Sequence, residues 1–506
     1  MGLIPYIIQS FRGGVSDENQ RGIPGSFKHG YNLDIHKRND SLSCGSTMAT
    51  VLGESVGVFG SSSAGTTMTG LFNVFVPSTD GSLYAFSSRG SIWCMSGDLQ
   101  WTFVYNDENG EIKGAAEWEN EDGGNYLYWA TSSSISRKLL PGSATATPDT
   151  GTNRWADVEM NYKVEFINSS AAWHTMKPAA GSLYIANGEG ISELTFDEVF
   201  DPYAMNVRPG NRINALEERN DYLILGTERE SGEEDGHIWS WAPTSENWIE
   251  KKRIPVNGVN AMIFTEFPLL QGGDNGEIFF SDFSNSVPLN AITGGGKSTP
   301  HGVVVFDDLA MFGIYGGSAV SYPGIWSYGR KRKNRSQALN YDYRLSPTIN
   351  GSTISSLAAI VNFNGLMLAS WGTEDSHTSA VDSEYGVDMV VSTTSASAIY
   401  EGLEFDAGRP FQKKMFRSAI VTMVALPSLT SISFKYKFDK ESAWRYGVTG
   451  GNSTTFSNTG ATEAEFIIGG MGFVFEVGLE LNPSGSDTPE ILAITTYLDG
   501  ESQEHK

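Results

Sequence analysis

Residues 330–335 read RKRKNR and place five basic side chains in six consecutive positions. Guanidinium and ammonium groups at this density bind phosphate or carboxylate oxygens, so the run is suited to contact DNA or an acidic protein surface. The acidic stretch Glu228–Asp235, on the same or an adjacent subunit, is one candidate partner. A solvated loop without a binding role is the alternative. The predicted interaction residues are Arg330, Lys331, Arg332, Lys333 and Arg335.

In contrast to this basic run, the chain as a whole has a large excess of acidic over basic residues. Its 506 residues include 59 Asp and Glu but 35 Lys and Arg, which gives a formal net charge of −24 and a pI of about 4.7. Such a charge repels nucleic acid from most of the surface and excludes phosphate contacts as the main source of binding free energy. We therefore favour an acidic protein surface over DNA as the partner of the basic run.

A second segment resembles a phosphate-binding loop. Residues 291–298 read AITGGGKS, which fits a loose form of the P-loop. That loop needs a preceding strand and a following helix, because its N–H groups and the helix N-terminus together cradle the phosphates. Residues 299–306 read TPHGVVVF instead, and no amphipathic helix follows. We therefore predict a glycine-rich connection between strands, with no nucleotide or other cofactor.

Patterns for metal binding and catalysis are incomplete. Asn106–Glu111 and Gly272–Glu277 lack the alternating oxygen ligands of a calcium loop, and Asn-Gly between apolar strands is typical of tight hairpins. The seven histidines are scattered without ligand spacing. Glu193–Asp201 and Glu228–Gly236 hold carboxylates, but the sequence cannot pair them across a sugar site as a glycosidase requires. We predict no metal site, no catalytic residues and no enzyme activity.

The elements that position these segments recur along the chain. The tetrapeptide GSLY occurs at residues 81–84 and again at 181–184. Relaxed copies share an apolar strand, a turn rich in Gly, Asn, Asp and Ser, and a second strand. Seven copies align on one apolar anchor each, at Leu83, Leu127, Leu183, Leu223, Leu269, Met311 and Met367. Successive anchors are 44, 56, 40, 46, 42 and 56 residues apart.

A repeat of about 40–50 residues with about four short strands is the signature of a β-propeller. One such unit cannot bury both of its faces alone, so the units stack around a central axis. The fold class we predict is all-β, with a propeller of about seven blades over residues 53–396. Six or eight blades remain open, because the two 56-residue steps could contain irregular strands.

Two regions lie outside the repeat. Residues 1–52 are polar and rich in glycine, and they predict an extended N-terminal arm with a hairpin. Residues 397–500 include SISFKYKFD, whose period-two alternation predicts a separate antiparallel, sandwich-like β domain. The tail 501–506 is expected to be disordered. No apolar run approaches the roughly 20 residues needed to cross a bilayer.

The two flanking regions resemble the tail hub or nozzle proteins of short-tailed bacteriophages. These proteins show F-x-G-G near residue ten, then a G-x-N-hydrophobic strand and a basic segment ending in S-L. This chain has Phe11–Gly14, Gly30–Asp34 and Lys37–Leu42, with Ser43-Cys44-Gly45 where the family has R-P-G. The segment GLEFDAGRPFQKKMFRSAIVTMV, followed by SISFKYKFD, is similar to the family's C-terminal strands.

The resemblance implies a structural virion protein of the phage tail, synthesised in the host cytoplasm. Copies would form a homo-oligomeric ring, a hexamer, below the portal and its adaptor, around a channel for genome ejection. In that ring the arm and the β domain would contact neighbouring subunits, other tail proteins or the adaptor. An arm ordered only by such contacts predicts that deletion of residues 1–30 spares the fold.

Two other functions remain open from the sequence. A tail propeller that binds a host glycan or receptor would expose aromatic platforms on one face, and a propeller glycosidase would show carboxylate-dependent turnover. The candidate platforms are Trp239, Trp241, Trp248, Trp326 and Trp371, although tryptophan side chains also pack in the core of a propeller.

Overall fold

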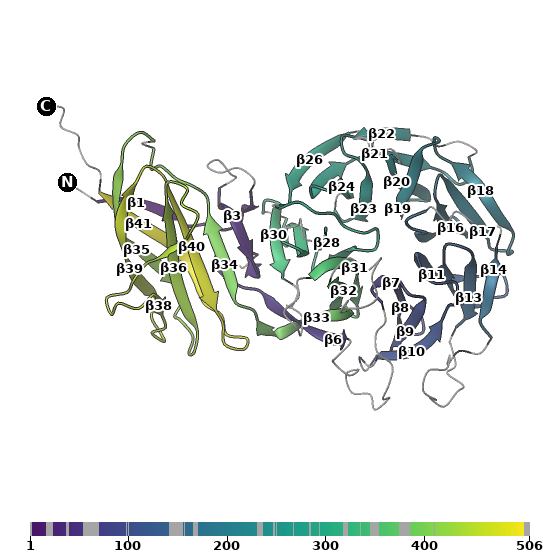
Figure 1. Cartoon of the computed structure of the whole chain (residues 1–506), viewed down its shortest axis with the longest axis horizontal. Coiled ribbons are helices and arrows are strands. Elements are labelled where there is room, and N and C mark those ends of the chain that lie inside the picture. Colours follow the sequence, from purple (N-terminus) through teal and green to yellow (C-terminus); the bar gives the residue numbers. More distant parts are fainter. Residues whose placement is uncertain are drawn as a thin grey trace.

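Every regular element in the described part of the chain is a β-strand. The computed structural model describes residues 3–16, 24–36, 40–53, 70–97, 99, 101–140, 155, 157–164, 171–229, 236–245, 248, 250–266, 268–282, 285–292, 294–316, 322–333, 335–344, 354–373, 385–408 and 410–499. The strands form a ring-shaped body and a smaller two-sheet body beside it, so that the molecule is elongated (Figure 1). No helix in these residues is long and apolar enough to cross a membrane. The predicted all-β class is confirmed.

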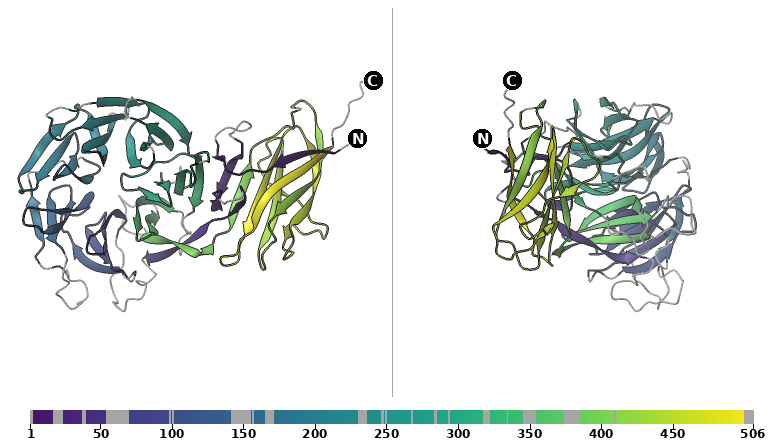
Figure 2. Two further views of the ribbon diagram at one scale, coloured as in Figure 1. Left: turned by 180° about the vertical axis from the view of Figure 1, so that it is seen from behind. Right: turned by 60° about the vertical axis from the view of Figure 1, so that its left-hand side comes forward.

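The ring-shaped body is a propeller of seven four-stranded antiparallel sheets in the described residues. The first strand of each sheet contacts the first strands of both neighbouring sheets, which closes a ring around the axis (Figure 2). From the inside outward, blade 1 consists of β7 (Phe72–Pro77), β8 (Leu83–Ser87), β9 (Ser91–Met95) and β10 (Trp101–Asn106). Blade 2 consists of β11 (Gly114–Glu119), β12 (Asn125–Ala130), β13 (Ile135–Leu139) and β14 (Glu159–Lys163). Blade 3 consists of β15 (Met176–Ala179), β16 (Ser182–Asn187), β17 (Gly190–Thr195) and β18 (Phe200–Asn206).

Blades 4 to 6 continue the same order. Blade 4 consists of β19 (Asn211–Arg219), β20 (Tyr222–Arg229), β21 (Gly236–Trp241) and β22 (Glu250–Ile254). Blade 5 consists of β23 (Val259–Phe264), β24 (Pro268–Gly272), β25 (Glu277–Ser281) and β26 (Ser286–Ala291). Blade 6 consists of β27 (Val303–Phe306), β28 (Leu309–Ile314), β29 (Gly324–Gly329) and β30 (Ala338–Tyr343). Blade 7 consists of β31 (Ile354–Phe363), β32 (Leu366–Thr373), β33 (Tyr385–Ser395) and β6 (Ser46–Gly53).

The repeat found in the sequence corresponds to these blades. All seven anchors lie on the second strand of successive blades, and each is at most 2% exposed. Both 56-residue steps fall within this series, and in the described residues they add no blade. The prediction of a β-propeller with about seven blades is confirmed.

The outer strand of blade 7 comes from the N-terminal region. Strand β6 pairs with β33, with Leu52 opposite Val387 and Ala49 opposite Met389. This difference from the expected boundary at residue 53 has a physical reason. A ring whose last blade is completed by an early segment is held closed by backbone hydrogen bonds between distant parts of the chain, and β33 is left without an open edge.

The smaller body is a β-sandwich that contains both ends of the chain. One sheet has the order β39-β35-β41-β5-β4, with β1 also on β41, and the other has the order β2-β3-β34-β40-β36-β37, with β38 also on β36. The strands are β1 (Leu3–Ile8), β2 (Gly14–Val15), β3 (Ser26–Tyr31), β4 (Leu33–Asp34), β5 (Leu42–Cys44), β34 (Ala398–Gly402), β35 (Lys414–Met423), β36 (Ser431–Phe438), β37 (Arg445–Tyr446), β38 (Thr455–Phe456), β39 (Glu463–Gly472), β40 (Phe475–Asn482) and β41 (Glu490–Asp499).

The expected extended arm is therefore not a separate element in this structure. Its strands β1 to β5 belong to the two sandwich sheets, and its last residues form β6 of the propeller. Phe11 and Phe27 are fully buried and lie edge-on or tilted against Tyr400, at centroid distances of 5.3 and 5.5 Å. The arm is ordered by packing against its own chain, so the expectation that its deletion spares the fold does not agree with the structure.

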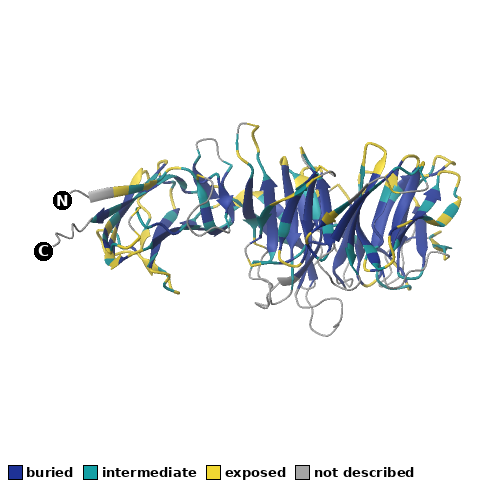
Figure 3. Cartoon of the chain, turned by 90° about the horizontal axis from the view of Figure 1, so that it is seen from above, coloured by how far each residue is buried: buried dark blue, intermediate teal, exposed yellow. Residues whose placement is uncertain are grey.

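The sandwich and the propeller share one hydrophobic core. The largest buried cluster contains sandwich residues such as Phe11 and Phe475 together with Leu339 and Tyr341 of β30. Gly14 lies at this contact with a φ of +70°, and a Cβ there would be 2.3 Å from the backbone oxygen of Leu339. Figure 3 shows buried residues in both bodies up to the place where they meet. The close backbone contact fixes blade 6 against the sandwich.

Candidate functional site

The basic run lies in the turn between β29 and β30, beside the sandwich. The Arg330 guanidinium donates to both carboxylate oxygens of Glu266, at 3.0 and 2.9 Å. Lys331 pairs with Asp307, and Arg335 pairs with Asp40 of the N-terminal region. Three of the five predicted interaction residues are thus bound to carboxylates of their own chain. The candidate partner Glu228–Asp235 falls outside the described residues from position 230 onward.

The other two basic residues, Arg332 and Lys333, are exposed at the tip of the turn. Within the part of the chain that the structure describes, neither forms an ion pair. Paired neighbours hold the base of the turn, so these two cations project from a fixed position. They are the members of the run that remain available to a partner.

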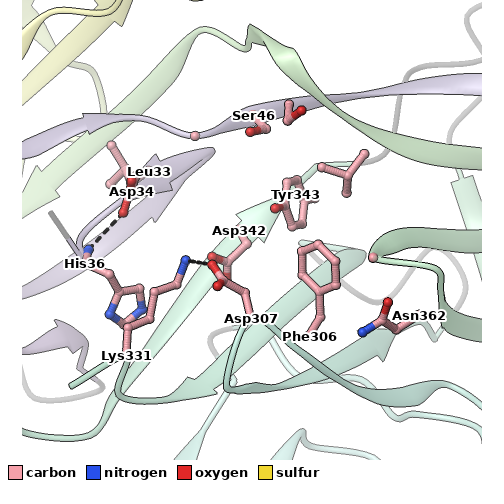
Figure 4. Close-up of a pocket in the computed structure, with 14 residues that line it drawn as sticks. Leu33, Asp34, His36, Ser46, Phe306, Asp307, Lys331, Asp342, Tyr343 and Asn362 are labelled. Carbon is pink, nitrogen blue, oxygen red and sulfur yellow. Dashed lines mark hydrogen bonds and ion pairs between the residues drawn. The ribbon is translucent and has the colours of Figure 1, made fainter. Parts of the chain in front are cut away.

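A cavity of about 430 Å³ lies directly beside this turn, between blades 6 and 7 and the sandwich (Figure 4). Its polar lining comes from distant segments: Asp34 at the end of β4 and His36 just after it, Asp307 and Lys331 of blade 6, Asp342 on β30, and Asn362 on β31. Sequence reasoning identified only Lys331 among these residues. No local pattern could have found the others, because the lining is assembled by the contact between the two bodies.

Burial changes the acid–base properties of this cavity. Desolvation raises the pKa of Asp342 to about 7, although Asn340 donates to its Oδ1 at 3.2 Å. Desolvation and the nearby Lys331 ammonium lower the pKa of His36 to about 4. Among the described groups, Oδ2 of Asp342 and Nε2 of His36 are buried without a hydrogen-bond partner. The cavity therefore holds a neutral imidazole and a carboxyl group close to its midpoint at neutral pH.

The propeller axis is closed by aromatic side chains. Trp173 precedes β15 of blade 3, and His301 precedes β27 of blade 6. These blades are not neighbours, yet the two rings lie edge to face with centroids 6.2 Å apart, so the contact spans the axis. Burial lowers the pKa of His301 to about 3, which keeps the ring neutral. A duplex cannot pass through the axis of a single propeller.

The glycine-rich segment 291–298 connects β26 of blade 5 to β27 of blade 6, as expected for a strand connection. Gly294, Gly295 and Gly296 all have positive φ, and Gly296 donates its N–H to the Asp274 backbone oxygen at 2.8 Å. Lys297 exchanges backbone hydrogen bonds with Tyr315 of the next blade. The segment is thus bound to both neighbouring blades.

The two calcium-like patterns lie in the connection after β10 and in the hairpin between β24 and β25. Asp107 of the first is 1% exposed and accepts a hydrogen bond from the Trp129 indole at 2.7 Å, so it serves the packing between blades 1 and 2. In the described residues no three His, Cys, Asp or Glu side chains are grouped as metal ligands.

The candidate aromatic platforms are mostly core residues. Trp239, Trp241, Trp326 and Trp371 are between 0 and 4% exposed, whereas Trp248 is 37% exposed and packs edge-on against Trp239 at 4.9 Å. Four of the five side chains therefore cannot stack on a sugar ring. The carboxylate-rich segment Glu193–Asp201 lies at the outer hairpin of blade 3, away from the cavity.

Comparisons with known proteins address the fold. No protein-family model matches the chain, and no curated protein matches it. The chain is similar to the WD40 β-propeller domain of Doa1, with a TM-score of 0.42 and 12% identity over 68% of this chain and 97% of that chain. It is also similar to the β-propeller domain of Cps50 (Swd1) from Myceliophteria thermophila, with a TM-score of 0.43 and 10% identity over 63% and 97%. The blade assignment itself rests on strand pairing.

Proposed function

We propose that the protein is a structural virion protein, a subunit of the tail hub or nozzle ring of a short-tailed bacteriophage. The observation that supports this proposal best is where the family-like segments lie. Phe11–Gly14 and Gly30–Asp34 come from the start of the chain, while β35 and β36 come from its last hundred residues, and all contribute to one sandwich.

These segments have structural roles rather than chemical ones. The Asn32 side chain donates to the Ser397 oxygen at 3.1 Å and accepts from the Arg344 N–H at 3.0 Å. Its backbone N–H donates to Tyr341 of blade 6 at 3.1 Å. The segments thus join the sandwich to the propeller, and a rigid two-body subunit suits a ring that must withstand genome passage.

The path for DNA in this proposal is the opening enclosed by the ring of subunits. The propeller axis is unsuitable because the Trp173–His301 contact closes it. With a net charge of −24, most of the lumen surface would repel the duplex and let it slide without the release of counterions that makes DNA binding tight. Arg332 and Lys333 would be isolated cations along this path.

The partners in this proposal are further copies of the chain, arranged as a hexamer, together with the portal, its adaptor and other tail proteins of the virion. The test is labelling of purified particles from the phage that encodes the chain, with gold-conjugated antibodies against the propeller. Label at the tail end, at several copies per particle, is expected. Label confined to the head, or particles that lack the protein, would refute the proposal.

A further inference from the structure

Two exposed apolar surfaces lie at opposite ends of the elongated molecule. One is formed by the residues just before β35, the turn after β36 and the end of β39, in the sandwich, and the other lies on β18 and the turn before it, at the far side of the propeller (Figure 1). Large contiguous apolar areas on a protein surface mark interaction sites. Their positions therefore raise the question of which partner covers each.

The first surface, here called the sandwich tip, consists of Phe411, Lys413, Lys440, Met471 and Phe473. Phe411 is 95% exposed, and the Lys413 ammonium lies 5.5 Å from the centroid of the Phe473 ring. Lys413 and Lys440 are both exposed. The acidic neighbour Asp439 is exposed and keeps its charge, so the two lysines outnumber it; its Oδ1 accepts the N–H of Phe473 at 2.7 Å. The sandwich tip is apolar with a basic border.

The second surface, here called the blade 3 rim, consists of Phe196, Asp197, Val199, Asp201 and Tyr203. Its apolar members are 46%, 58% and 68% exposed in chain order. The rim includes β18, whose outer edge is unpaired among the described residues. Asp197 and Asp201 are exposed.

Two cations lie near the rim, Arg137 and Lys163, and the exposed acids of the rim and its border outnumber them. The Lys163 ammonium donates to the Glu198 backbone oxygen at 3.3 Å. Arg137 lies between two carboxylates, at 3.0 Å from Glu159 and 2.6 Å from Glu198. Its side chain is also 8% exposed, so it is buried in these pairs. Two more exposed acids, Glu121 and Asp122, lie in the adjacent hairpin of blade 2, where Glu121 donates its N–H to the Phe196 oxygen at 2.9 Å. The rim is therefore apolar with an acidic border.

We propose that the sandwich tip of one copy docks on the blade 3 rim of the next copy. Both surfaces are apolar, their border charges are opposite, and neither is complementary to itself. A contact between different surfaces of identical chains is heterologous and closes into a ring when its rotation permits. Because the surfaces lie at opposite ends, each subunit contacts two neighbours. This inference rests on the proposed ring and names the surfaces that build it.

The test uses charge reversal in the full-length chain. The tip variant carries Lys413→Glu and Lys440→Glu, and the rim variant carries Asp197→Lys and Asp201→Lys. A matched control carries Arg89→Glu and Arg253→Glu, which reverses two exposed cations of blades 1 and 4 that belong to neither surface. Because all substitutions are on exposed side chains, far-ultraviolet circular dichroism and the unfolding midpoint should match those of the wild type.

Mass photometry then reports assembly. Wild type and control are expected to form the same ring, whereas the tip variant and the rim variant each remain monomeric. An equal mixture of the two variants should assemble again, because each junction then pairs opposite charges. Loss of assembly in the tip variant with a normal rim variant would indicate a two-fold contact instead and would overturn the proposal.

Two other outcomes overturn the docking surfaces without deciding the proposed function. If both variants form rings like the wild type, the ring exists but uses other surfaces. If the wild type stays monomeric at every concentration, the head-to-tail contact is wrong, and the labelling of phage particles decides separately whether the protein belongs to the tail.

Discussion

The propeller and the sandwich are built from the same kind of antiparallel strand, but they connect the chain differently. In blades 1 to 6 each strand pairs with the strand that precedes or follows it. In the sandwich, by contrast, Leu3 of β1 lies opposite Asp499 of β41. Local pairing repeats and leaves a pattern in the sequence, whereas pairing between the chain ends leaves none. The same residues 1–53 complete both bodies.

Removal of the N-terminal strands is the most severe test of this difference between the propeller and the sandwich. Deletion of residues 1–31 removes β1, β2 and β3 but keeps β6, so the sandwich should lose its fold while the propeller stays closed. The buried Phe11 and Phe27 are lost from the shared core, and each truncation of such a side chain alone costs about 3–5 kcal/mol. Limited proteolysis with mass spectrometry should yield a resistant propeller fragment and a degraded sandwich.

A longer deletion of residues 1–53 sharpens this result. It also removes β6, so blade 7 loses its outer strand and the propeller fragment should become sensitive too. Equal resistance of the sandwich in the wild type and in the shorter deletion would show that the N-terminal strands are dispensable, as the sequence alone suggested.

The junction between the two bodies is tested at Asn32, which has a φ of +53°. Asn32→Gly removes two side-chain hydrogen bonds and should destabilise the protein by about 1–3 kcal/mol. Asn32→Ala should cost about 1 kcal/mol more, because alanine is strained in the left-handed region. Denaturant unfolding measures both values.

Asn364 provides the matched control for this junction. It has a φ of +52° in an exposed blade turn, so Asn364→Ala should show the backbone strain alone. If Asn364→Ala and Asn32→Ala cost the same, the hydrogen bonds at Asn32 do not hold the two bodies together.

The difference between local and distant strand pairing also explains which parts of the fold and of the candidate site can be predicted from the sequence. The anchors from Leu83 to Met367 identified the blades, because every blade repeats one apolar position on its second strand. The predicted arm, residues 1–52, contains nearly all of β6, and the sequence does not show that this segment belongs to blade 7, since its partner β33 lies more than 300 residues away. Likewise, Asp342 and His36 become neighbours of one cavity only when the sandwich meets blade 6. Single-sequence patterns contain no signal for such contacts.

The cavity between the two bodies gives a smaller, pH-dependent effect. The pKa of Asp342 is about 7 in the folded chain, above its ordinary value of 3.8, so stability is lost as the pH rises from about 4 to 7. Asp342→Asn should therefore match the wild type near pH 4 and exceed it in stability at pH 8. Thermal unfolding across this range measures the difference, which partial solvent exposure keeps modest.

His36, in the same cavity, changes the stability of the folded chain with pH in the opposite direction to Asp342. Its pKa is about 4 in the folded chain and 6.5 ordinarily, so its contribution is lost as the pH falls from about 6.5 to 4. With Asp342 removed, this loss on acidification should be steeper than in the wild type. An unchanged pH profile in Asp342→Asn would contradict the assignment of Asp342 as the titrating group.

The smallest effect is expected in the basic turn. Arg330→Gln removes a partly exposed bidentate pair with Glu266 and should cost about 1 kcal/mol. Lys333→Gln removes an unpaired exposed charge and should leave the free energy of unfolding unchanged. A large loss of stability in Lys333→Gln would show that this side chain has a partner within the chain.

The central claim is that the protein is a ring subunit joined head to tail, and single-particle electron microscopy of the purified full-length chain tests it most directly. The account predicts closed rings whose central opening is distinct from the propeller axes, with the sandwich tip of each copy against the blade 3 rim of the next. Monomers at all concentrations, or dimers related by a two-fold axis, would contradict it.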